Sequence, residues 1–108
     1  MSKDTSYYST IQKWNLEGLN PTSLSRCKTQ GLIIAEVDRA SNELQNYSIH
    51  YSIDEVKKEL KRLWDSYWFD YIESDWELEK LPNGFTNCYT DFLVMSPEEF
   101  NSKGWRME

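Results

Sequence analysis

The clearest hydrophobic pattern in the chain follows Ser52, where apolar residues recur every three or four positions, as they do along one face of a helix. Ser52 is a favourable N-cap, and Glu55 three residues later completes a capping box. We therefore predict a central helix over residues 53–71. Its apolar face is expected to consist of Val56, Leu60, Leu63, Trp64, Tyr67 and Tyr71.

Two shorter segments before this helix have the pattern of strands. Residues 32–37 are rich in branched side chains and follow a glycine, which is typical of a strand. The polar residues 38–43 predict a turn, and residues 44–51 alternate as a second strand, so the two strands form a hairpin. The residues expected to meet the apolar face of the helix are Ile33, Ala35, Val37, Tyr47, Ile49 and Tyr51.

The hydrophobic period changes after Ser74. Trp76 and Leu78 alternate with acidic residues, which is strand spacing rather than helical spacing. Asn83 followed by Gly84 is a strong hairpin signal, and residues 85–95 read as one long strand. The preferred interpretation is a second hairpin of residues 76–81 with residues 85–94, and the alternative is a loop over residues 75–81.

Short helices are predicted near both ends of the chain. Residues 9–19 carry a weak helical pattern, and Pro21 begins a second short helix that turns Leu24 and Cys27 to the core and stops at Gly31. Near the C-terminus, residues 96–99 combine a serine cap, a proline and a capping-box glutamate, which predicts a helix closed by Gly104. Residues 1–8 are expected to be a flexible polar arm.

Together these elements predict one globular domain over residues 1–108. Five Trp, seven Tyr and four Phe supply large side chains for its core. The fold class expected is α+β: an antiparallel sheet of two β-hairpins packed on one long central helix, with short N- and C-terminal helices.

The cysteines and the N-terminal residues predict a cytoplasmic protein. Cys27 and Cys88 lie far apart without ligand-like spacing, so we expect two reduced thiols. No apolar run follows Lys3, which argues against a signal peptide. No stretch approaches the roughly 20 apolar residues that span a bilayer, so no membrane contact is expected.

The net charge of −6 is concentrated in one part of the chain. Residues 1–50 carry five basic and five acidic side chains and are neutral, whereas six carboxylates and no base lie between Trp64 and Glu79. These acids are interleaved with aromatic residues, which favours a contact surface over a merely solubilising one. The predicted partner-binding residues are Asp65, Phe69, Asp70, Glu73, Asp75, Trp76, Glu77 and Glu79.

Structural explanations compete with this reading. Phe69, Ile72 and Trp76 would lie opposite the core face of the helix if it extends that far, and the short helices could cover them. The alternating acids from Glu73 to Glu79 could simply protect an edge strand from aggregation.

The sequence contains no pattern typical of a metal site, a cofactor site or a nucleic-acid-binding surface. The acidic run lacks the glycine-containing turn of a calcium loop, so no metal site is expected, and the glycines form no phosphate-binding loop, so no cofactor is expected. Direct nucleic-acid binding is disfavoured because it depends on Lys and Arg. His50 is the only histidine and is expected to be a surface or boundary residue.

The function predicted is that of a small, acidic, non-catalytic protein-binding module. Its acidic and aromatic surface would dock on a basic site of a partner protein, as inhibitors, immunity proteins and phage antagonists do, and proteins that bind nucleic acids offer such sites. A second hypothesis is a structural or assembly subunit that uses the same aromatics for homo-oligomerisation. A small enzyme using His50 and carboxylates is the third.

Overall fold

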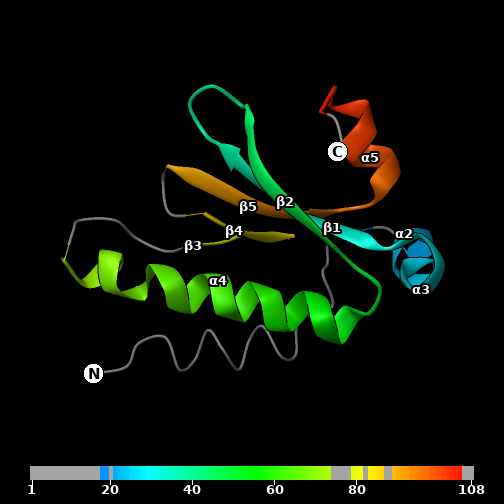
Figure 1. Cartoon of the computed structure of the whole chain (residues 1–108), viewed down its shortest axis with the longest axis horizontal. Coiled ribbons are helices and arrows are strands. Elements are labelled where there is room, and N and C mark those ends of the chain that lie inside the picture. Colours follow the sequence, from blue (N-terminus) through cyan, green and yellow to red (C-terminus); the bar gives the residue numbers. More distant parts are fainter. Residues whose placement is uncertain (1–17, 20, 74–78, 82, 87–88, 106–108) are drawn as a thin grey trace.

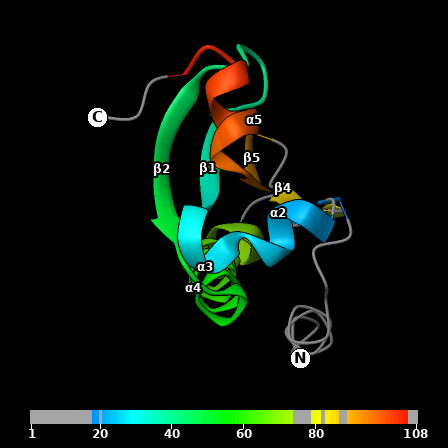
Figure 2. The same cartoon turned by 90° about the vertical axis from the view of Figure 1, so that its right-hand side faces the viewer.

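A five-stranded antiparallel sheet forms the middle layer of the molecule. The computed structural model describes residues 18–19, 21–73, 79–81, 83–86 and 89–105, and for residues 67–73 and 79–80 it describes the backbone alone. The strands lie in the order β2 (Leu44–His50), β1 (Leu32–Asp38), β5 (Thr90–Met95), β4 (Gly84–Thr86) and β3 (Glu79–Leu81). Helix α4 (Ile53–Glu73) runs along one face, and α5 (Pro97–Ser102) lies on the other (Figures 1 and 2). The predicted α+β class with an antiparallel sheet is confirmed.

Helix α4 begins where the sequence predicts. The Glu55 amide donates to Ser52 Oγ at 3.1 Å, which satisfies one of the backbone donors left open at the start of a helix. The four predicted core residues whose side chains are described are all buried: Val56, Leu60, Leu63 and Trp64. They pack in one cluster with Leu32 and Ile34 of β1 and with residues of β4 and β5. The side chains of Tyr67 and Tyr71 lie outside the described residues.

The predicted helix after Asn20 is two short helices. Helix α2 (Pro21–Ser25) begins at the proline, as expected, and α3 (Cys27–Gln30) follows after Arg26. Cys27 is buried and Leu24 packs against the core cluster, which confirms the predicted inward face. Gly31 ends α3 with a φ of 82°, a conformation that glycine adopts readily. The arm predicted over residues 1–8 and most of the helix predicted over residues 9–19 lie outside the described residues.

The prediction for the two faces of β1 was wrong. Leu32 and Ile34 face α4, whereas Ile33, Ala35 and Val37 belong to a second cluster with Met95 and Phe100 on the opposite face of the sheet. Strand β1 pairs with β2 and β5 along its two edges, and side chains of both its faces are buried, one set with α4 and the other with Phe100 of α5, so both faces are apolar. In the β1–β2 register, Tyr47 lies opposite Ala35 and Ile49 opposite Ile33, so these two residues also point away from α4.

The single long strand predicted over residues 85–95 is also wrong. Strands β4 and β5 are separate and pair antiparallel with each other, with Phe85 opposite Phe92. Strand β3 pairs with β4 over three residues, so the C-terminal half contributes three consecutive antiparallel strands to the sheet. Gly84 makes the β4–β5 contact possible, because a Cβ there would lie 1.7 Å from the Phe92 carbonyl oxygen.

Helix α5 covers the face of the sheet that α4 leaves open. The Glu99 amide donates to Ser96 Oγ at 3.1 Å, and Pro97 is the first helical residue, as the sequence predicts. Phe100 is fully buried, with its ring centroid 5.2 Å from that of Tyr47 and 5.4 Å from that of Trp105. Trp105 therefore holds the end of α5 against the body of the protein.

Candidate partner-binding site

The predicted acidic site spans the last part of α4 and the start of β3. Asp65, Phe69, Asp70 and Glu73 belong to α4, and Glu79 is the first residue of β3. Asp65 is exposed, and partial burial raises the pKa of its carboxyl. Asp75, Trp76 and Glu77 lie outside the described residues, as do the side chains of Phe69, Asp70, Glu73 and Glu79.

The C-terminal end of α4 extends beyond the sheet. Figure 1 shows the C-terminal end of α4 extending past the ends of the strands, while its N-terminal half lies under β1 and β5. The last turn of α4 contains no basic residue. Acids at the C-terminal end of a helix oppose the helix dipole, so this arrangement costs a small amount of stability that the sequence accepts.

A second group of polar residues lies between the edge of the sheet and the middle of α4. Four residues are on the face of the sheet that α4 covers: Glu36 of β1 and Asn46, Ser48 and His50 of β2. Ser48 and His50 lie opposite Ile34 and Leu32, which pack against α4, and Glu36 and Asn46 follow the same alternation. Ser48 Oγ and His50 Nε2 are 2.8 Å apart and share a hydrogen bond. His50 is half-buried, as expected for a boundary residue.

Two glutamates in this group respond differently to their surroundings. Partial burial raises the pKa of Glu36, and the nearby Arg62 guanidinium and a hydrogen bond from Asn46 offset only part of that effect. The hydrogen bond from Arg62 lowers the pKa of Glu59, and Arg62 Nε donates to Glu59 Oε1 at 2.9 Å. Arg62 thus binds Glu59 directly and acts on Glu36 only through its charge.

The contact between Cys27 and His50 does not form a catalytic pair. Cys27 Sγ donates to the backbone carbonyl of His50 at 3.8 Å, so the imidazole ring is not its partner. Burial and, to a lesser extent, the charge of Glu55 raise the pKa of the Cys27 thiol. A raised pKa keeps the thiol protonated, whereas a nucleophilic cysteine needs its thiolate. Cys88 lies outside the described residues.

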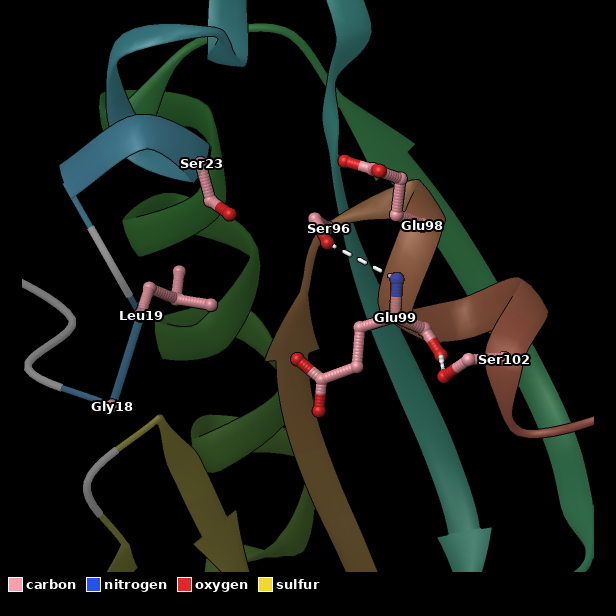
Figure 3. Close-up of a pocket in the computed structure, with 7 residues that line it drawn as sticks. All are labelled: Gly18, Leu19, Ser23, Ser96, Glu98, Glu99 and Ser102. Atoms are coloured by element: carbon pink, nitrogen blue, oxygen red, sulfur yellow. Dashed lines mark hydrogen bonds between the residues drawn. The ribbon is translucent and has the colours of Figure 1, made fainter.

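A pocket that the sequence did not predict lies between α2 and α5. Its volume is about 370 Å³, and Figure 3 shows the carboxylate of Glu99 directed into the space between α5 and Leu19. Two of the serines around it stabilise α5, because Ser96 Oγ accepts a hydrogen bond from the Glu99 amide and Ser102 Oγ donates to the Glu99 carbonyl at 2.6 Å. Glu99 also lies 3.9 Å from Lys103 Nζ. These polar groups therefore have structural partners within α5.

Within the described part of the chain, no cluster of three or more His, Cys, Asp or Glu side chains has the arrangement of a metal site. No helix in that same part is both long enough and apolar enough to cross a bilayer. No protein-family model, curated protein or solved structure matches the chain.

Proposed function

We propose that this protein is a small non-catalytic binding module that docks the acidic segment from Asp65 to Glu79 on a basic site of another protein. The observation that carries the proposal is the distribution of charge: six carboxylates without a base between Trp64 and Glu79 account for a net charge of −6. A concentrated field of one sign steers a partner of the opposite sign and raises its association rate.

The placement of α4 supports the proposal. Its first half is anchored by Val56, Leu60, Leu63 and Trp64, all buried against the sheet. The acidic C-terminal half of α4 follows on the same helix, and its end extends past the strands (Figure 1). A partner could therefore bind the acidic end without disturbing the core, and a site on a helix needs little ordering on binding.

The basic residues of α4 do not offset this acidic end. They lie in the first half of the helix, where three acids, Asp54, Glu55 and Glu59, nearly balance three lysines and Arg62, and where Arg62 is paired with Glu59. We infer that Phe69 and Trp76 act as apolar anchors among the carboxylates, because aromatic residues in a charged rim dominate binding energy at many interfaces. The use of these aromatics for homo-oligomerisation remains the alternative prediction.

Differential capture from the native host tests this function. The bait is the full chain, and its variant carries Asp70→Lys, Glu73→Lys and Glu77→Lys. A matched control carries Glu43→Lys, Asp54→Lys and Glu98→Lys, which changes the net charge equally at three exposed positions elsewhere. Wild type and control should retain the same partner at low salt, whereas the acidic-segment variant should lose it. Circular dichroism checks that all three proteins fold.

The partner then allows a kinetic test. Its association with wild type should slow as salt rises, because charges are screened within roughly 10 Å at 0.1 M. Truncation of Trp76 or Phe69 to alanine should mainly speed dissociation. Full binding by the acidic-segment variant, together with a salt-independent association rate, would show that the acidic run is only a solubility device.

A further inference from the structure

The two edges of the sheet differ in how well they are protected against pairing with another strand. Strand β3 has three residues, two of them the charged Glu79 and Lys80, and Pro82 follows it. Short length, charge and proline are the usual devices that keep an edge strand from pairing. Strand β2, at the other edge, has seven residues, LQNYSIH, with no Asp, Glu, Lys, Arg or Pro.

The open edge of β2 is regular over residues 46–50. The register with β1 shifts only between Glu36 and Val37, which pair with Asn46 and Leu44 and leave Gln45 as the extra residue of a bulge. From Asn46 to His50 the pairing with β1 is continuous. Figure 2 shows β2 as the outermost strand on its side, with no other helix or strand of the described residues beyond it.

We propose that residues 46–50 of β2 pair antiparallel with the same residues of a second copy of this chain, around a two-fold axis at Ser48. In this arrangement the outer edge of β2, with which no strand of the described residues pairs, forms backbone hydrogen bonds with the second copy. The sheets of the two copies become one continuous sheet. We place the axis at Ser48 because this residue is the midpoint of the regular segment. A two-fold axis there pairs residue 46 of one copy with residue 50 of the other.

The side chains of β2 match each other in this register. On the α5 side, Ile49 of each copy faces Tyr47 of the other, and pairs of an aromatic with a β-branched residue stabilise antiparallel strands. Ile49 is 37% exposed although it is a large aliphatic residue, so this contact would cover surface that the monomer leaves in water. On the α4 side, Ser48 faces Ser48 and Asn46 faces His50, which are all polar.

If two copies associate, charge favours contact at this uncharged edge over contact at a surface rich in acidic residues. Each chain carries a net charge of −6, so two copies repel each other, and the repulsion is smallest where their contact surface is itself uncharged. β2 supplies such a surface. Because a five-residue pairing buries less than the roughly 1,200 Å² of a standard interface, we expect a weak dimer, with a dissociation constant on the order of micromolar.

Sedimentation equilibrium on the full chain tests the dimer. Wild type should pass from monomer to dimer over the micromolar range. Ile49→Lys should be monomeric throughout, since a charged residue on an edge strand blocks pairing. The added lysine lowers the net negative charge, so greater repulsion between chains cannot explain the loss. The control Ser25→Lys, at an exposed site on α2, makes the same charge change and should dimerise like wild type. A wild-type monomer, or an unaffected Ile49→Lys dimer, would overturn the proposal.

A cross-linking experiment tests the register and does not depend on the folding of the lysine variant. Ser48→Cys, in a Cys88→Ser background, should form a disulfide dimer when treated with diamide. Paired Cα atoms across an antiparallel ladder are about 4.5–5.5 Å apart, within the range a disulfide spans. Asn46→Cys lies on the same face but about 14 Å from its own copy in this register, so it should not cross-link. Equal cross-linking of the two variants would contradict the two-fold axis at Ser48.

Discussion

At the residue scale, the core of the protein depends most on side chains that join α4 to the sheet. Leu60 is fully buried in the cluster that also contains Ile34 of β1 and Phe92 of β5. Trp64 and Phe85 meet edge to face with centroids 5.4 Å apart, and Phe85 stacks on Phe92 at 4.6 Å. Leu60 and these rings belong to one buried cluster drawn from α3, α4 and three strands, so few neighbours are free to fill a space left there.

Leu60→Ala should lower the free energy of unfolding by about 2–5 kcal/mol, the usual cost of a buried leucine-to-alanine change. The cavity persists because its walls belong to several elements. Urea denaturation measures the change. Lys58→Ala, at an exposed position of the same helix, is the control and should change stability by less than about 0.5 kcal/mol. Equal effects of the two substitutions would contradict the placement of the core.

Glu36 and Glu59 should give opposite pH dependence of stability. The pKa of Glu36 is raised in the folded protein, so its favourable contribution is present below the pKa of the unfolded chain and is lost as pH rises through the folded value. Glu36→Gln should therefore stabilise the protein at neutral pH, with a difference that disappears in acid. The pKa of Glu59 is lowered, so Glu59→Gln should destabilise at neutral pH, and that difference should also vanish as pH falls. Urea denaturation at two pH values measures both, and effects of the same sign would contradict the assignment.

At the element scale, the sequence predicted the elements with clear end signals and mispredicted what lies between them. Ser52 with Glu55 and Ser96 with Glu99 marked the starts of α4 and α5, and the structure has the expected amide-to-serine bonds. These signals are local, so the sequence carries them in full. The faces of β1 were not predictable in this way, because Leu32, Ile33, Ile34 and Ala35 are all apolar and give no alternation. The packing of α4 on one face of β1 and of α5 on the other explains that pattern.

The break between β4 and β5 also escaped the sequence analysis, because Phe85, Phe92 and Val94 fit a single strand as well as two. The separation depends on a close contact across the pair. Gly84→Ala should destabilise the protein, because the new Cβ would lie 1.7 Å from the Phe92 carbonyl oxygen and the strands must move apart. The expected loss exceeds the roughly 1–2 kcal/mol that Gly104→Ala should cost, since Gly104 has a φ of 84° but no neighbouring atom near its Cβ position. Thermal denaturation compares the two variants, and the reverse order would contradict the β4–β5 contact.

At the scale of the whole molecule, the sequence indicated the acidic segment but not the open edge of β2. The acidic segment was recognisable because six carboxylates without a base are a feature of composition. The open edge of β2 was not, because nothing in LQNYSIH reveals which strand lies at the end of the sheet. The order of strands follows from the β1–β5 pairing, which joins residues far apart in the chain.

The acidic segment and the open edge of β2 should respond to salt in opposite directions. Docking of the acidic segment brings unlike charges together, so salt should slow association with the captured partner. Pairing of two β2 edges brings together two chains that each carry a net charge of −6, so salt should strengthen the dimer by screening their repulsion. A series of sodium chloride concentrations from about 0.05 to about 0.5 M tests both expectations, because the screening length falls from more than about 10 Å to only a few Å over this range. Sedimentation equilibrium measures the dimer of the chain alone, and stopped-flow mixing measures association with the partner. A dimer that weakens with salt would mean that opposite charges hold it together, which the uncharged β2 strand cannot supply.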